Sequence, residues 1–357
     1  MIRIRIKGGY GASNFGDDLL MIVFENFFLK EFQNIELNFD GLNAEYPKKL
    51  LVKSEYLLDD FKEDWLVYGG GTQFFSFTSK SVDTTFSKIL RAIFNPKLIL
   101  AKYRSFKEKN RMIKVGIVGL GLGPFNNNLK YIEIIKGILS NTNFIGLRDH
   151  ESLKYCEDWN IKALLGADVV FSSYFTVPEK SSVKNTKKRI GIIVRDWDWE
   201  ESGKGYFKPI QEYYKLSKNS DEIELIYILF SSNKDAKWQK ITANENVLSW
   251  DPDVYSVDEF LNSLNQFDAF ITARYHGAIL GSLLNKPTIA IEIEPKLRIL
   301  TEQIPEILLW SKPFQIENLK NLVSRLNYNV DYSQSNKILR DLSDKMLLEF
   351  KNQIIKK

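Results

Sequence analysis

The sequence predicts an α/β protein made of two Rossmann-like halves, each a parallel sheet with helices on both faces. Two observations support this prediction. Short apolar strands alternate with helical periods along most of the 357 residues, a pattern typical of parallel sheets covered by helices. A polar, aperiodic segment interrupts the alternation near the middle of the chain. We therefore expect a first domain at 1–176, a linker at 177–188, a second domain at 189–334 and a terminal helix at 335–357.

The first half contains short apolar runs that predict strands, and helical periods lie between them. A helix over residues 17–32 follows the first strand and is apolar on most sides, which indicates a helix packed between neighbours. Residues 126–140 show a second helical period. The strands are expected at residues 2–6, 35–39, 65–68, 115–118 and 144–147.

The second half repeats the alternation and closes with a long helix. Residues 335–357 form an amphipathic helix, and its apolar side would allow it to return and pack on the first domain. The strands are expected at residues 189–194, 223–230, 268–272 and 288–291.

The composition favours a cytoplasmic enzyme. The formal net charge is only +4, so the protein as a whole has no strong field. Cys156 is the single cysteine, which excludes an internal disulfide and a cysteine metal cluster. The first residues alternate like a strand and lack the apolar core of a signal peptide. No clustered His, Asp and Glu pattern indicates a bound metal.

The segment 271–279 (ITARYHGAI) predicts an anion site. A strand ends at Thr272, Arg274 and His276 follow two residues apart, and a helix begins at Gly277. This arrangement places a permanent cation, an imidazole and a helix N-terminus at the carboxyl end of a parallel strand, where open α/β sheets bind their ligands. The chain has only two histidines, and His276 is the one in such a place.

Three glycine-rich turns follow predicted strands of the first half. Neither the dinucleotide fingerprint nor the phosphate-binding loop is matched, and a tight turn would explain any one of them. Because all three follow strands of one sheet, we expect them to converge on one crevice. The turns lie at residues 8–18, 69–73 and 119–125, and their candidate ligand-contacting residues are Gly11, Asn14, Asp17, Asp18, Gly70, Gly71 and Gly121.

The order of these motifs resembles that of the polysaccharide pyruvyl transferase family. The resemblance implies two Rossmann-like domains facing a central cleft, as in the GT-B glycosyltransferases. It also implies that phosphoenolpyruvate gives its pyruvyl group to two hydroxyls of a sugar as a cyclic ketal, with release of phosphate. The matching pieces are GASNFGDD at 11–18, GGG at 69–71, GLGLGP at 119–124, GLRDHES at 146–152, GAD at 166–168 and RYHG at 274–277.

Phosphoenolpyruvate carries a phosphate and a carboxylate, so its site needs clustered cations and backbone donors. Arg274 and His276 are the first candidates, with Gly277 beside them, and Arg195 at the end of the strand 189–194 is the next. A salt bridge to Asp196 or Asp198 would equally explain Arg195. Capping of the following helix is the alternative for His276.

Ketal formation also needs groups that give and take protons. His276 is our candidate for the acid–base group or for a phosphate partner. The base stays open between Asp17 and Asp18, because carboxylates in a first helical turn also stabilise the helix dipole. Asn14 is suited to orienting a hydroxyl of the acceptor.

Two further motifs have competing interpretations. In residues 148–152 we expect structural roles, with Asp149 starting a helix, Arg148 forming an ion pair and His150 exposed. Trp197 and Trp199 fit either a platform for a sugar ring or a partly buried surface pair.

Residues 86–114 form an unusually basic segment with interleaved apolar residues. Such a segment fits peripheral contact with anionic lipid at the inner face of the membrane, and it would suit an acceptor carried on a polyprenyl diphosphate. A solvated helical face is the alternative. Nucleic acid is not expected, because no known binding module accompanies the run.

Two rival functions remain open on the sequence alone. One is a GT-B glycosyltransferase that uses a nucleotide sugar, in which Glu292 or Glu294 would hold the ribose. The other is a non-catalytic module that binds an anion or a sugar.

Overall fold

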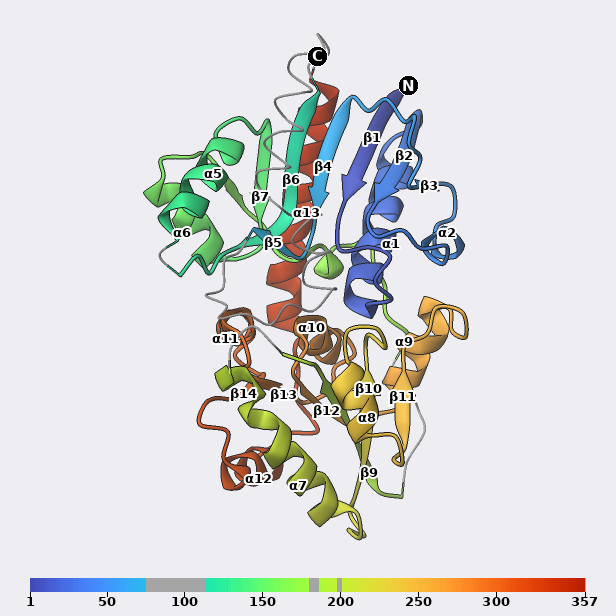
Figure 1. Ribbon diagram of the computed structural model, residues 1–357, viewed down its shortest axis with the longest axis vertical. Helices are drawn as coiled ribbons and strands as arrows, with labels where there is room; N and C mark the ends of the chain where they lie inside the picture. Colours follow the sequence, from blue (N-terminus) through green and yellow to red (C-terminus); the bar gives the residue numbers. More distant parts are fainter. Residues whose placement is uncertain (75–112, 127, 180–185, 198–200, 357) are drawn as a thin grey trace. The chain divides into compact units, whose positions relative to one another are not determined.

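The computed structural model describes residues 1–74, 113–126, 128–179, 186–197 and 201–356. The chain divides into two compact units (Figure 1). Unit 1 comprises Met1–Gly11, Asp17–Phe175 and Leu339–Lys357, and unit 2 comprises Ala12–Gly16 and Thr176–Ile338. Each unit contains a parallel sheet with helices, which confirms the predicted fold class.

The sheet of unit 1 has the strand order β3-β2-β1-β4-β6-β7-β8 in the described part of the chain, with β5 paired to β6. The chain order reverses between β1 and β4, so the switch point lies there. The strands are β1 (Ile2–Lys7), β2 (Ile35–Asp40), β3 (Glu55–Tyr56), β4 (Trp65–Gly69), β5 (Thr72–Phe74), β6 (Lys114–Leu122), β7 (Phe144–Leu147) and β8 (Leu164–Leu165). Among the residues that the structure describes before Thr176, the α-helices are α1 (Phe15–Glu31), α2 (Pro47–Leu50), α5 (Leu129–Leu139) and α6 (His150–Asp158).

The terminal helix α13 (Ser333–Ile355) packs on one face of this sheet, behind β4 and β6 in Figure 1. Glycines on the strands make room for its large side chains. A Cβ added at Gly116 of β6 would lie 2.7 Å from the ring of Phe350, and one added at Gly146 of β7 would lie 2.6 Å from Met346. The predicted return of this helix to the first sheet is therefore confirmed.

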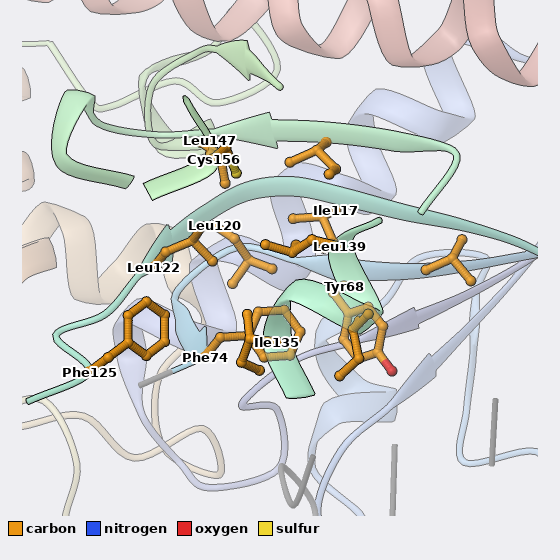
Figure 2. Close-up of a cluster of buried hydrophobic side chains, with 13 residues drawn as sticks. Tyr68, Phe74, Ile117, Leu120, Leu122, Phe125, Ile135, Leu139, Leu147 and Cys156 are labelled. Carbon is orange, nitrogen blue, oxygen red and sulfur yellow. The ribbon is translucent and has the colours of Figure 1, made fainter. Parts of the chain in front are cut away.

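The opposite face of the sheet carries a buried apolar cluster (Figure 2). Val115 and Ile117 point to this face because side chains alternate along β6, and Ile135 and Leu139 of α5 cover them. Cys156 of α6 is fully buried in the cluster, as expected for a small apolar residue. Burial raises the pKa of its thiol to about 11, which disfavours the reactive thiolate.

The sheet of unit 2 has the strand order β11-β10-β9-β12-β13-β14 among the described residues. The chain order reverses between β9 and β12, which places the switch point there. The strands are β9 (Lys188–Val194), β10 (Ile223–Leu229), β11 (Val247–Ser249), β12 (Ala269–Thr272), β13 (Thr288–Ile291) and β14 (Leu308–Trp310). The helices are α7 (Phe207–Ser217), α8 (Ala236–Ile241), α9 (Val257–Asn265), α10 (Tyr275–Leu283), α11 (Pro295–Gln303) and α12 (Ile316–Ser324).

The predicted central strands of both sheets agree with the structure within a few residues. The edge strands β3, β8, β11 and β14 were not expected, because each has only two or three residues and shows no periodicity. Helix α10 begins at Tyr275 rather than at Gly277. None of the described helices is both long and apolar enough to cross a bilayer.

Candidate functional site

Charged side chains gather at the switch point of unit 2. Arg195 follows β9, Arg274 follows β12, and the segment after β13 carries Glu294 and Lys296. These three strands are adjacent and parallel, so their carboxyl ends lie at one edge of the sheet. This is the edge at which open α/β sheets bind ligands.

Arg274 is buried and is held by three acceptors. Its guanidinium forms an ion pair with Asp235, donates from Nη1 to Oδ1 of Asn14 at 3.2 Å, and donates from Nε to the carbonyl of Val194 at 3.4 Å. Asp235 is itself fully buried and accepts at 3.0 Å from the backbone N–H of Asp196. Asp235 therefore offsets most of the charge of Arg274, and the three acceptors fix the orientation of the planar guanidinium group.

His276 lies in the first turn of α10 and is half-buried. Its ring packs against the backbone of Gly16, because a Cβ added at Gly16 would lie 2.2 Å from Nδ1 of His276. Asn14 and Gly16 belong to unit 2 with Arg274 and His276. The structure thus brings the middle of the first glycine-rich turn onto the predicted anion site.

Arg195 pairs with a carboxylate that is distant in sequence, and Asp196, one of the two suggested partners, has other contacts. Its guanidinium pairs with Glu294 and lies over the ring of Trp197, 4.8 Å from the ring centroid. The carboxylate of Asp196 instead accepts from backbone N–H groups at the start of α8, and Asp198 lies outside the described residues. Trp197 is fully buried, so its proposed role as a platform for a sugar ring is wrong, and Trp199 is also outside the described residues.

Lys296 is a cation of this site that the sequence analysis missed. Its ammonium lies 3.0 Å from Glu294 and 5.7 Å from the ring centroid of Tyr275. Burial alone would raise the pKa of Glu294, but Arg195 and Lys296 together hold this pKa below its usual value. The signal was available, since Glu294, Pro295 and Lys296 open a helix just after the strand next to β12.

The N-terminus of α10 adds backbone donors to the site. Arg274 occupies the N-cap position, and its side chain forms no capping hydrogen bond. Gly277 lets α10 pack closely on the sheet, because a Cβ at this position would lie 2.3 Å from Oγ1 of Thr272 and 2.9 Å from Ile193. The first N–H groups of such a helix attract anions. Substrate binding by Gly277 stays a prediction.

At the switch point of unit 1 the two candidate bases have different surroundings. Asp18 is fully buried and accepts a hydrogen bond of 2.8 Å from the Tyr46 hydroxyl. Asp17 is half-buried and its carboxylate lies against the Gly9 turn, where a Cβ would be 2.7 Å from Oδ2 of Asp17. A carboxylate that must reach a substrate has to be accessible, which favours Asp17 over Asp18.

The glycines of the three turns each have a local reason for being glycine. Gly11 has a φ of +79° and packs on the Tyr56 hydroxyl, and Gly70 has a φ of +70° and packs on Leu20. Gly71 has a φ of +75° with little around it, so its backbone conformation alone favours glycine. A role for these glycines in substrate binding stays a prediction.

The third turn and the motif at 148–152 have structural roles. A Cβ at Gly121 would lie 3.0 Å from the guanidinium of Arg148, which is buried and pairs with Asp168 at 3.2 Å. Asp149 caps α6 by accepting from the N–H of Ser152 at 2.7 Å, and His150 is exposed. The predicted ion pair, helix cap and exposed histidine are confirmed. Substrate contact by Gly121 stays a prediction.

The predicted basic segment 86–114 lies almost entirely outside the described residues. Its contact with a membrane therefore stays a prediction. Within the described ranges, no group of three or more His, Cys, Asp or Glu side chains has the arrangement of a metal site.

Comparisons with known proteins agree with this architecture. A sequence model of the polysaccharide pyruvyl transferases matches residues 14–295, which covers most of both units. No curated protein matches the chain in sequence.

Solved structures of other proteins share the fold. The S. aureus MnaA–UDP complex aligns with a TM-score of 0.63 at 12% identity, covering 99% of this chain and 96% of that one. The UDP-GlcNAc 2-epimerase of Neisseria meningitidis bound to UDP-GlcNAc gives 0.57 at 14%, with 100% of both chains covered. A glycosyltransferase from Rickettsia africae gives 0.54 at 13%, with 99% of both chains covered. The fold is therefore GT-B-like.

Proposed function

The chain belongs to the polysaccharide pyruvyl transferase family, and from this premise we propose that it moves the pyruvyl group of phosphoenolpyruvate onto two hydroxyls of a sugar. Two C–O bonds form at the enol carbon C2 and its bond to the phosphate oxygen breaks. The two hydroxyls lose two protons in total. C3 takes up one proton, which converts the methylene to a methyl group, and the released phosphate takes up the other. The product is a cyclic ketal with a free carboxylate.

The charged cluster at the switch point of unit 2 is the observation that supports this proposal most. Phosphoenolpyruvate presents two anionic groups on a small skeleton, and recognition requires several cations within a short distance. Arg195 and Lys296 both lie against the carboxylate of Glu294, so two cations meet in this part of the cluster. The N-terminus of α10 adds backbone donors. Unit 2 is thus our donor unit.

We assign proton transfer to His276 and Asp17. His276 follows Arg274 by two residues and lies in the first turn of α10, and we expect it to protonate C3 of the donor or to bind the phosphate. Asp17 is the accessible carboxylate of the unit 1 switch point and is our base for an attacking hydroxyl. Unit 1 is thus our acceptor unit.

The acceptor that we propose is a sugar of a bacterial surface polysaccharide, such as an exopolysaccharide, or of its polyprenyl-diphosphate-linked precursor. The reaction would then take place in the cytoplasm at the inner face of the membrane. Contact through the basic segment 86–114 would bring the enzyme to a lipid-linked acceptor.

The same site disfavours a nucleotide-sugar glycosyltransferase. In that rival, Glu292 or Glu294 would have to hold a ribose hydroxyl. Glu294 is already bound by Arg195 and Lys296, and Glu292 lies 3.6 Å from the Arg298 guanidinium. Both carboxylates are committed to cations of the protein.

Incubation with phosphoenolpyruvate and a panel of lipid-linked and nucleotide sugars tests the proposal. We expect phosphate release only when a suitable acceptor is present, together with a product that has gained the mass of the pyruvyl group. Consumption of nucleotide sugars without pyruvyl transfer would support the glycosyltransferase instead. Binding of phosphoenolpyruvate with no turnover on any acceptor would indicate a non-catalytic module.

A further inference from the structure

The segment Ala12–Gly16 belongs to unit 2, although its neighbours in sequence on both sides belong to unit 1. We propose that this segment is a built-in part of the donor site, in which Asn14 is a positioning residue for Arg274 and Phe15 is the anchor. The inference rests on the proposed function of unit 2 as the donor unit. It moves Asn14 from the acceptor, where the sequence suggested it, to the donor.

Phe15 fixes the segment in an aromatic pocket of unit 2. Its side chain has no exposed surface, and its ring centroid lies 5.3 Å from that of Phe230, 4.8 Å from that of Trp250 and 4.6 Å from that of Phe260. Aromatic contacts of this kind add to the large apolar area that a phenylalanine buries.

Hydrogen bonds hold the backbone on both sides of Asn14. The N–H of Phe15 donates to the carbonyl of Phe230 at 2.9 Å, and the Ser231 hydroxyl donates to the carbonyl of Ala12 at 3.3 Å. The position of Asn14 is therefore set by unit 2 residues that lie more than 200 positions away, since the Ser231–Ala12 bond alone spans 219 residues.

Asn14 then orients Arg274 without cancelling its charge. The Asn14 amide oxygen accepts from Nη1, while Asp235 takes Nη2 and the Val194 carbonyl takes Nε. A guanidinium carries more N–H donors than these three acceptors use, so further N–H groups stay available to a bound anion. A carboxylate at position 14 would also accept from Nη1, but it would place a second negative charge on Arg274 and repel that anion.

The same segment positions the imidazole. A Cβ at position 16 would lie 2.2 Å from Nδ1 of His276, so any side chain at this position would displace the ring. The segment therefore contacts both residues of the predicted anion site.

The substitution Asn14→Asp tests the charge argument in the full-length protein. We expect the Kd of phosphoenolpyruvate, measured by calorimetry without acceptor, to rise about tenfold or more, because the added negative charge beside Arg274 repels the anionic donor. The KM of the acceptor should not change. Asn141→Asp, at an exposed position of unit 1, is the matched control and should bind like the wild type. Unchanged donor affinity with a raised acceptor KM would overturn the inference and return Asn14 to the acceptor.

A second measurement tests the positioning without any ligand. The Arg274 Nε–H signal in a nitrogen-15 NMR spectrum, identified through Arg274→Lys, should shift in both Asn14→Ala and Phe15→Leu. An unmoved signal in both variants would overturn the inference. If the signal moves but the wild type binds no phosphoenolpyruvate, the proposed function fails and the positioning role of Asn14 stands.

Discussion

The two units share a topology but differ in the chemistry of their switch points. In each sheet the chain order reverses between the first strand of that sheet and a strand three places later in sequence, β4 in unit 1 and β12 in unit 2. In unit 1 the strand ends carry glycine turns and the carboxylate Asp17. In unit 2 they carry Arg195, Arg274 and Lys296.

The difference teaches that topology sets where a ligand binds and that the side chains set which ligand it is. An anionic donor needs cations and helix N-termini. A neutral sugar whose hydroxyls must attack needs a proton acceptor and close backbone approach. Under our proposal, unit 2 binds the anionic donor and unit 1 binds the sugar.

Replacing His276 should have the largest effect. We expect His276→Ala to lower kcat/KM about 10²- to 10⁴-fold, the range for loss of a general acid or base. The matched control is His150→Ala, which removes the only other histidine, an exposed residue of unit 1. Steady-state phosphate release measures both. Equal activity of the two variants would show that the imidazole of His276 has no part in the reaction.

The two carboxylates of unit 1 should separate into a base and a structural residue. Asp17→Asn is expected to lower kcat about 10²- to 10³-fold without raising the KM of phosphoenolpyruvate. Asp18→Asn should mainly lower stability, because it weakens the buried bond from Tyr46. Kinetics and thermal unfolding of both variants check this. If Asp18→Asn loses turnover while its stability is unchanged, Asp18 rather than Asp17 is the base.

Variants of the Arg274–Asp235 pair can distinguish a structural role of Arg274 from a role in the reaction. Arg274→Ala should reduce the free energy of unfolding by about 3 kcal/mol or more, because it leaves Asp235 buried without its cation. The double variant Arg274→Met with Asp235→Leu should recover most of this stability and stay inactive. Denaturant unfolding measures the stability of both variants, and the phosphate-release assay measures their activity. An active double variant would mean that the guanidinium serves only the fold.

The smallest effect should come from Glu31, at the C-terminal end of α1. Glu31 accepts from Lys351 at 2.7 Å and from the Tyr174 hydroxyl at 2.8 Å, and the bond from Lys351 holds the pKa of Glu31 below its usual value. A carboxyl group whose pKa is lower in the folded than in the unfolded protein stabilises the fold at pH values above its unfolded-state pKa. This contribution is lost as the pH falls through the pKa of the folded state. Glu31→Gln should therefore cost about 1 kcal/mol at pH 7 and progressively less as the pH falls below the ordinary pKa of a glutamate, with unchanged activity. Unfolding curves across this pH range would contradict the account if the cost were the same at every pH.

Much of this molecule could be predicted from the sequence, because its signals are local. Buried strands such as β9 and β12 are continuous apolar runs, and Arg274 and His276 directly follow one of them. The roles of Asn14 and Phe15 could not be predicted, since the bond from Arg274 to Asn14 joins residues 260 positions apart. Arg195 shows the same limit, because its pairing with Glu294 joins residues 99 positions apart.

Titration of the full-length protein with phosphoenolpyruvate in the absence of acceptor tests most directly whether unit 2 binds the donor and unit 1 the acceptor. Lys296→Ala should weaken binding about tenfold or more, because it removes a cation from the unit 2 cluster. Lys320→Ala, an exposed cation of α12, and Asp17→Asn of unit 1 should both bind like the wild type. Weakened binding in Asp17→Asn together with wild-type affinity in Lys296→Ala would contradict the assignment of the donor to unit 2.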